Sequence, residues 1–203
     1  MSNKFIKSGF QNIDNIFGGW MRSKMYVLKL GKRTKSEPVI RQIVQKTDAK
    51  NIIIFDLNGN ISIDDERVVV YDKETALAKC KHYAFNDFVI SEIIKIENKK
   101  ETVDLVIIDD YQHCEPDELG SEGKPIGSTY MEIKWGHIPL IIVSRGFQKN
   151  WAWMKVRTTC TLKMKNGQLN AKEPIVHLIV RKLDEAFWKL ERWVDEREKS
   201  KQK

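Results

Sequence analysis

Four short apolar runs, each ending in polar side chains, constrain the fold of this chain more than any other feature of its sequence. They cover residues 25–30 (MYVLKL), 51–57 (NIIIFDL), 104–110 (DLVIIDD) and 138–144 (IPLIIVS). Consecutive apolar and β-branched residues are typical of strands that are buried on both faces, as the strands of a parallel sheet are. The four runs therefore predict the buried strands of a parallel sheet.

The segments between these runs carry helical patterns. Residues 39–44 (VIRQIV) follow the first run after a basic loop. In residues 86–100, apolar side chains follow one helical face, with Val89, Ile93 and Ile96 on it and Phe88 and Ile90 beside it. Alternating strands and helices predict an α/β domain with a central, mainly parallel sheet flanked by helices. Ligands of such domains bind at the carboxyl ends of the strands, so the polar ends of the four runs are candidate site positions.

The C-terminal region has a different pattern. Alternating residues flank the turn signal Asn166-Gly167, which predicts a β-hairpin. The chain ends in an amphipathic helical pattern and a basic tail, so we expect a domain over residues 1–181 and a C-terminal helix and tail over residues 182–203. This helix is typical of one packed on its own domain. Its large aromatic residues are nevertheless candidate partner-binding residues: Phe187, Trp188 and Trp193.

The composition excludes several classes of protein. With 41% hydrophobic and 31% charged residues, 11 Gly and 5 Pro, the 203-residue chain is neither disordered nor collagen-like. No apolar run approaches the roughly 18 residues of a membrane span, and the first residues lack a secretory signal pattern. We expect a soluble, cytoplasmic protein without membrane contact. Neither the three cysteines (Cys80, Cys114, Cys160) nor the four histidines have a spacing that indicates a disulfide framework, a zinc site or a catalytic set.

The charge favours a polyanionic partner. The chain carries a net charge of +7, which would attract nucleic acid. In residues 144–157, cations alternate with aromatic rings, a combination suited to single-stranded DNA because bases stack while phosphates are neutralised. The candidate nucleic-acid-binding residues are Arg145, Lys149, Trp151, Trp153, Lys155 and Arg157. The alternative is that the tryptophans anchor this loop to the core or to a neighbouring subunit.

The N-terminal segment carries the motif residues Gly9, Phe10, Ile13, Asp14, Gly18 and Gly19. Together with the segments VDLVIIDDYQ and HIPLIIVSRG, it resembles RecA-like ATPases of the DnaB helicase, RadA and KaiC group. VDLVIIDDYQ is similar to the acidic strand of this family, with Asp109 at the metal-associated aspartate and Gln112 at its glutamine, and HIPLIIVSRG is similar to the strand that follows. The resemblance implies a RecA-like fold, and it implies that the loop after the last of these strands contacts DNA.

The phosphate loop departs from the family pattern. Such a loop needs glycines whose backbone N–H groups wrap the phosphates, a lysine, and a hydroxyl that holds magnesium. Read from Gly31, the sequence GKRTKSEP places Ser36, Glu37 and Pro38 where Gly, Lys and Ser/Thr belong, and a carboxylate would repel phosphate. A second alignment makes Lys35 and Ser36 the Lys-Ser pair of a shortened loop. The candidate, vestigial nucleotide-binding residues are Gly31, Lys32, Lys35, Ser36, Asp109 and Gln112.

A second departure concerns the catalytic carboxylate. The resemblance places Asn58 where DnaB-like proteins have the glutamate that positions the attacking water, and an amide is not a general base near neutral pH. Asp56 could substitute only if the chain bends after it. Asp109 is open to two interpretations, magnesium binding or the cap of a strand end.

These features predict a catalytically degenerate, DnaB/RecA-like accessory protein of DNA replication or recombination, which binds DNA or a protein complex and uses no cofactor. One alternative is an active ATPase or helicase domain that uses ATP and magnesium through Lys35, Ser36 and Asp109. Another is a module that binds only protein partners. An oligomer is compatible with the resemblance, because family members form hexamers or filaments.

Overall fold

The computed structural model describes residues 5–22, 24–31, 33–80, 85–99, 101–109, 138–145, 160–165 and 168–172. All of them belong to the first of the two units into which the chain divides, residues 1–172. The predicted boundary at residue 181, the C-terminal helix and the histidines lie outside the described residues. No helix among the described residues is both long enough and apolar enough to cross a membrane.

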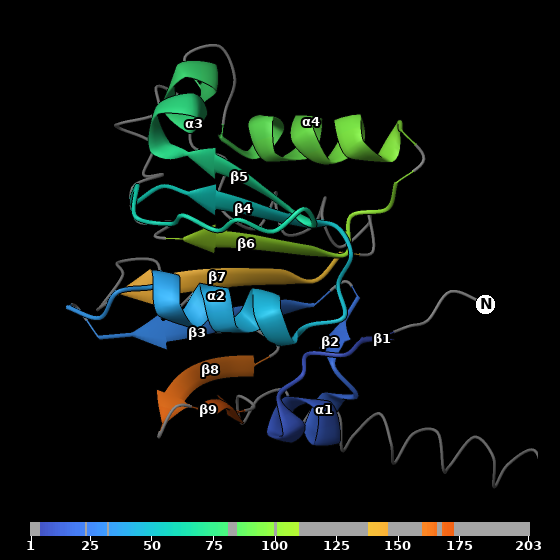
Figure 1. Cartoon of the computed structure of the whole chain (residues 1–203), viewed down its shortest axis with the longest axis vertical. Helices are drawn as coiled ribbons and strands as arrows, with labels where there is room; N and C mark the ends of the chain where they lie inside the picture. The colour runs from blue at the N-terminus through green and yellow to red at the C-terminus, as the bar shows by residue number, and fades with distance from the viewer. Residues whose placement is uncertain are drawn as a thin grey trace, which may run out of the picture. The chain divides into compact units, whose positions relative to one another are not determined.

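The centre of the domain is a mostly parallel sheet, as predicted, and it has seven strands among the described residues. Its strand order is β5-β4-β6-β7-β3-β8-β9 (Figure 1). The strands are β3 (Met25–Leu30), β4 (Ile52–Asp56), β5 (Val68–Asp72), β6 (Leu105–Asp109), β7 (Leu140–Arg145), β8 (Cys160–Lys165) and β9 (Gln168–Lys172). Every neighbouring pair is parallel except β8 and β9. A separate two-stranded antiparallel sheet joins β1 (Phe5–Ile6) to β2 (Trp20–Met21).

The four apolar runs form β3, β4, β6 and β7, and these strands lie next to one another in the sheet. All residues of β4 and β6 are buried, which explains why their sequences show no polar face. Strand β5 was not predicted from the sequence. Its residues are exposed or half-buried because it has only one strand neighbour among the described residues.

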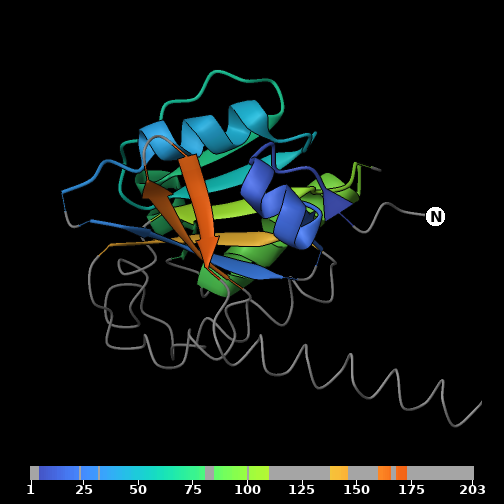
Figure 2. The ribbon, with the colours of Figure 1, turned by 90° about the horizontal axis from the view of Figure 1, so that it is seen from below.

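Helices cover both faces of the sheet. They are α1 (Gln11–Phe17), α2 (Glu37–Lys46), α3 (Lys73–Cys80) and α4 (Phe85–Glu97). One apolar cluster joins α2 to alternate residues of the strands, such as Ile54 and Ile107. The other joins α4 to the residues between them, such as Phe55 and Ile108. The two clusters follow from the period-2 alternation of strand side chains, and Figure 2 shows α2 along one face.

Backbone geometry explains the N-terminal motif. Asp14 accepts hydrogen bonds from the backbone N–H of Ser8 at 2.9 Å and from its hydroxyl at 2.7 Å, so its carboxylate fixes the start of α1. Gly9 has a φ of 72°, and a Cβ added there would lie 2.1 Å from the carbonyl oxygen of Lys46. Gly18 ends α1 in the left-handed conformation with a φ of 77°. These residues therefore have structural roles in joining the N-terminal segment to α1 and α2.

Strands β8 and β9 pair in antiparallel register, from Thr161 opposite Lys172 to Lys165 opposite Gln168. The two residues between the strands are Asn166 and Gly167, which lie outside the described residues. Within the part of the chain that the structure describes, this pair forms the end of the sheet beyond β3 (Figure 1).

Candidate functional site

The carboxyl ends of the parallel strands bring together three charged residues on one face of the sheet. Asp56, Asp109 and Arg145 are the last residues of β4, β6 and β7. Each follows alternate residues that pack on the α2 side of the sheet, including Ile54 in β4 and Val143 in β7. Strand alternation therefore directs all three side chains toward the face that carries α2, and the N-terminus of α2 lies at the same edge.

Ser36 brings the loop after β3 into this cluster. It lies at the start of α2, where a serine usually caps the helix with its side-chain oxygen. Here the side chain makes no cap hydrogen bond. Its hydroxyl instead donates to Asp109 Oδ2 at 2.5 Å and is buried. The contact joins residues that are 73 positions apart in the sequence, so it exists only because β3 and β6 run parallel in one sheet.

Arg145 completes the cluster. Its Nη2 donates to Ser36 Oγ at 2.5 Å and lies 3.3 Å from each carboxylate oxygen of Asp109. Its Nε donates to the carbonyl oxygen of Thr34 at 3.4 Å. The side chains of Arg145 and Asp109 are 11% and 0% exposed, so the ion pair is shielded from water. Ser36, Asp109 and Arg145 are called the edge cluster below.

The electrostatic state of Asp109 reflects this burial. Burial raises the pKa of its carboxyl group above the usual value, while the hydrogen bond from Ser36 and the charge of Arg145 oppose the rise. Asp56, its register neighbour on β4, also raises the pKa because it is a second negative charge. The cluster thus keeps a carboxylate in a poorly solvated position with one guanidinium as counter-charge.

Asn58 also reaches the edge cluster. When its amide is oriented with the oxygen toward donors, Oδ1 lies 3.3 Å from both Nη1 and Nη2 of Arg145 and accepts a hydrogen bond from Asn60 at 2.6 Å. The structure thus brings Asn58, which the resemblance puts at the catalytic glutamate, into contact with Arg145. The residue there is an amide.

Asp56 is held by its own turn. Its carboxylate accepts hydrogen bonds from the backbone N–H groups of Asn58 at 3.2 Å, Gly59 at 2.8 Å and Ile61 at 2.6 Å. Gly59 has a φ of 70°, so the chain does bend immediately after β4. The bend uses the carboxylate as the acceptor that closes it, a common role of aspartate in turns.

The other described residues of the loop after β3 are exposed: Gly31, Arg33, Thr34 and Lys35. Thr34 N donates to the carbonyl oxygen of Gly31 at 2.9 Å, which forms a tight turn. Lys35 is exposed, and the carboxylate of Glu37 accepts a hydrogen bond from Arg41 on the surface of α2 at 2.6 Å. The remaining predicted site residues lie outside the described residues: Lys32, Gln112, Lys149, Trp151, Trp153, Lys155, Arg157, Phe187, Trp188 and Trp193.

The fit of a magnesium ion can be tested on this geometry. Magnesium takes oxygen ligands at about 2.0–2.1 Å in an octahedral arrangement. The oxygens that the resemblance assigns to it are those of Ser36 and Asp109, and Arg145 Nη2 contacts both residues. The residues in this arrangement therefore do not fit a metal ion. Among the described residues, no group of three or more His, Cys, Asp or Glu side chains is placed to hold a metal ion.

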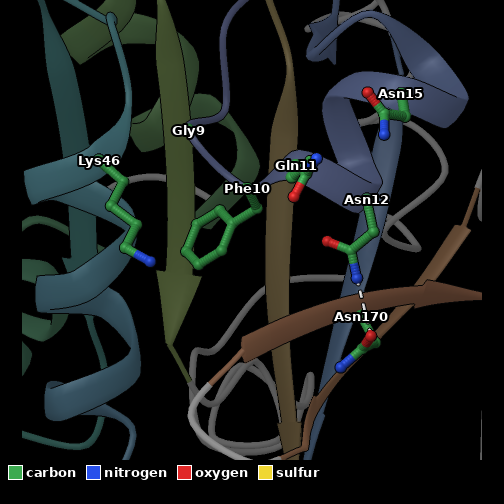
Figure 3. Close-up of a pocket in the computed structure, with 7 residues that line it drawn as sticks. All are labelled: Gly9, Phe10, Gln11, Asn12, Asn15, Lys46 and Asn170. Carbon is green, nitrogen blue, oxygen red and sulfur yellow. Dashed lines mark hydrogen bonds between the residues drawn. The ribbon is translucent and has the colours of Figure 1, made fainter.

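A separate pocket of about 480 Å³ is lined by residues from the start of α1, the C-terminus of α2 and β9 (Figure 3). It is lined by Gly9, Phe10, Gln11, Asn12, Asn15, Lys46 and Asn170. Asn12 donates to Asn170 at 2.7 Å, and Lys46 Nζ lies 4.8 Å from the centre of the Phe10 ring. Its polar side chains are exposed or half-buried. The pocket is therefore open to solvent, and none of its lining residues is a buried charged side chain that could select a ligand.

Every member of the edge cluster is among the residues predicted from the sequence, but Arg145 was assigned to nucleic acid and the other two residues to nucleotide. The contact of Arg145 with the other two was not predicted. The signal that could have revealed it is the alternation in β7, which puts Arg145 on the same face as Ile141 and Val143. The pocket had no comparable signal, because its residues come from three separate segments of the chain.

Comparison with known proteins adds no family assignment. No protein-family model and no curated protein sequence matches this chain.

Proposed function

We propose that this chain is a RecA-like, DnaB-related domain without ATP hydrolysis, and that it acts by binding, as a DNA-binding or complex-forming accessory in DNA replication or recombination. The observation that carries the proposal is the lack of a suitable general base in the turn that follows β4. The resemblance puts Asn58 at the position of the catalytic glutamate, and three backbone N–H groups donate to the carboxylate of Asp56, two residues before it. An amide is not a general base near neutral pH, and the Asp56 carboxylate already serves as the acceptor that closes the turn after β4.

Three features support the RecA-like part of the proposal. The sheet is mainly parallel, the residues of the N-terminal motif hold that segment against α2, and the acidic strand β6 ends beside the start of α2. The DNA part is supported by the net charge of +7 and by the cations and aromatic rings of residues 147–157, whereas Arg145 is paired with Asp109.

Two assays on the full chain test the proposal. ATP turnover, measured with and without single-stranded DNA, should be indistinguishable from a blank without protein. Fluorescence anisotropy with a labelled single-stranded oligonucleotide should show binding that weakens as salt rises, because each neutralised phosphate releases counterions. Turnover that depends on Asp109 would overturn the loss of hydrolysis.

A triple variant, with Trp151→Ala, Trp153→Ala and Arg157→Ala, tests the DNA site. We expect its affinity for the oligonucleotide to fall by at least about tenfold, since stacking on each base contributes on the order of 1–3 kcal/mol. Lys99→Ala is the matched control, because it also removes one positive charge but from an exposed position after α4. Equal affinities of the triple variant and the control would rule out this DNA site. Absence of DNA binding by the unchanged chain at modest salt would favour a protein partner.

One observation favours a second candidate, an ATPase or helicase domain with a shortened loop. Ser36 contacts Asp109, as the alignment with Lys35 and Ser36 at the Lys-Ser pair requires. Glu37 instead lies against Arg41, away from the cluster. This candidate predicts ATP turnover that falls in both Lys35→Ala and Asp109→Ala, which the turnover assay measures directly.

A further inference from the structure

The edge cluster contains its own cation, the guanidinium of Arg145, which lies where a metal ion bound to Ser36 and Asp109 would lie. Ser36 Oγ and the Asp109 carboxylate are oxygens of the kind that bind magnesium or manganese. Arg145 Nη2 lies 2.5 Å from the first and 3.3 Å from both oxygens of the second. An ion bound to Ser36 and Asp109 would overlap the guanidinium or lie in contact with it. Like charges repel strongly where water is excluded.

We propose that Arg145 takes the place of a divalent cation at Ser36 and Asp109, so that guanidinium and metal ion exclude each other, and that removal of Arg145 opens a divalent-cation site. The inference rests on the proposed function and deepens it, because it names the group that keeps magnesium out of the site. It concerns the ground state of the protein and involves no chemical step.

The surroundings of the cluster support this assignment. Asp109 is fully buried, and its Oδ1 accepts no hydrogen bond from the described residues although Arg145 lies 3.3 Å away. This oxygen is held by charge rather than by a directed donor, so it is available to another cation once the guanidinium is gone. The Asn58 amide oxygen, 3.3 Å from Arg145 in the orientation described above, adds a third oxygen of the kind that hard cations accept.

Arginine also differs from a metal ion in a way that matters here. A guanidinium is planar, is always protonated and donates directed hydrogen bonds. It neutralises the carboxylate, but it offers no open coordination position for a phosphate oxygen or a water. A magnesium ion at the same place would offer several. The edge cluster is therefore balanced in charge without the chemistry that a metal ion supplies.

Manganese binding by the full chain tests the proposal without any assay of activity. Free hexaaqua Mn²⁺ gives an electron paramagnetic resonance signal that disappears on binding, so a titration measures affinity directly. We expect the unchanged chain to leave the signal intact. We expect Arg145→Ala and Arg145→Gln to bind one Mn²⁺ at least about tenfold more tightly than the unchanged chain, a difference of about 1.4 kcal/mol.

Two further variants make the result specific. Arg145→Gln combined with Asp109→Asn should lose the gained binding, because the carboxylate is the anionic ligand. Arg67→Gln removes a guanidinium from another Arg–Asp pair, with Asp65, and serves as the matched control that should gain nothing. Mn²⁺ binding by the unchanged chain that disappears in Asp109→Asn would overturn the proposal. Folded Arg145 variants that bind no better than Arg67→Gln would overturn it as well.

The test also covers unstable variants. If the Arg145 variants are unfolded without metal, the proposal expects millimolar Mn²⁺ to restore their circular dichroism, because a ligand that binds only the folded state stabilises it. Failure of Mn²⁺ to restore either variant would count against the proposal. The outcome is separate from that of the proposed function, because ATP turnover by the unchanged chain would refute the latter whatever the metal titration shows.

Discussion

The two edges of the parallel sheet both carry an Arg–Asp pair, but the pairs differ in burial. At the amino edge, before β5, Arg67 and Asp65 lie 2.7 Å apart with side chains that are 30% and 22% exposed. At the carboxyl edge, Arg145 and Asp109 lie 3.3 Å apart and are 11% and 0% exposed. The first pair is accessible to water, which screens its charges, and the second is not.

The partners of the two arginines differ as well. Arg67 donates to the carbonyl oxygens of Val44 at 2.9 Å and of Thr47 and Ala49 at 3.1 Å, and it therefore ties the C-terminal end of α2 to the chain before β5. Arg145 donates to one carbonyl oxygen, that of Thr34 at 3.4 Å, and its main contacts are with the side chains of Ser36 and Asp109. Arg67 thus donates hydrogen bonds to backbone carbonyl groups at the end of α2 and after it, whereas Arg145 neutralises the charge of a buried carboxylate.

The aspartates titrate in opposite directions for this reason. The hydrogen bond from the Arg67 side chain holds the pKa of Asp65 below its usual value. Burial raises the pKa of Asp109 although an arginine is adjacent. The comparison shows that an adjacent arginine lowers the pKa of a carboxyl group below its usual value only when its contribution exceeds the cost of desolvation. Four experiments test this comparison or extend it to other contacts at the two edges.

The largest expected effect comes from breaking the buried pair. Arg145→Met should lower the free energy of unfolding by about 3–5 kcal/mol at pH 7, because it leaves Asp109 buried without a counter-charge. Urea denaturation followed by circular dichroism measures the change. Arg145→Met combined with Asp109→Leu should recover most of the loss, since it removes the unpaired charge. A loss below about 1 kcal/mol for the single variant would mean that the pair behaves like an exposed one.

The next effect contrasts a glycine at each edge. Gly9→Ala should cost about 2–4 kcal/mol, because the left-handed backbone disfavours a side chain and the new Cβ would overlap the Lys46 carbonyl oxygen. Gly59→Ala should cost only about 1–2 kcal/mol, since its φ is similar but nothing lies within 4 Å of the added Cβ. Thermal and urea unfolding of both variants give the comparison. Equal losses would show that packing at Gly9 adds nothing to the backbone strain.

Removal of Arg67 has a smaller expected effect. Arg67→Ala should lower the free energy of unfolding by about 1–3 kcal/mol, because three carbonyl hydrogen bonds are lost but water can reach the groups that remain. Hydrogen exchange should show faster exchange at the C-terminal end of α2, near Val44, than at its start. Arg67→Lys is the control that retains the charge without the planar fork, and we expect it to recover little.

The smallest effects are in the pH dependence of stability. A lowered folded pKa means that the unfolded state binds more protons, so the contribution of Asp65 is present above about pH 4 and is lost as the pH falls through its folded pKa. A raised folded pKa reverses the sign, so the contribution of Asp109 grows as the pH falls through that value toward about 4.

Unfolding of the unchanged chain, Asp65→Asn and Asp109→Asn between pH 7 and 3 measures both trends. The stability of the unchanged chain relative to Asp65→Asn should decrease with acid, and its stability relative to Asp109→Asn should increase. Parallel trends for the two variants would show that burial does not separate the two carboxyl groups.

Much of the fold followed from local patterns. The apolar runs predicted β3, β4, β6 and β7 because a buried parallel strand leaves no polar face in the sequence. The helical spacing of Val89 and Ile93 predicted α4, which buries both residues. Strand β5 was not predicted because one side of it has no strand neighbour among the described residues. Its exposed and half-buried side chains therefore do not alternate regularly along the strand.

The candidate site was predictable in position but not in contacts. Each buried apolar run ends in polar residues, and the carboxyl ends of parallel strands lie at the same edge of a sheet. The sequence therefore predicted that Asp109, Asn58 and the loop before α2 lie at one edge. The sequence by itself thus determined which residues gather there, because the period-2 pattern and the polar ends are local properties of the chain.

Only the tertiary structure decided which of these residues contact one another and how their charges are balanced. In the sheet, β7 lies between β3 and β6, and this insertion places Arg145 against Ser36 and Asp109, which precede it by 109 and 36 residues. No local pattern encodes that strand order, because it depends on which strands pair most favourably once the whole core is buried. The same burial sets the charge balance of the edge cluster, which depends on the exclusion of water and not on sequence spacing.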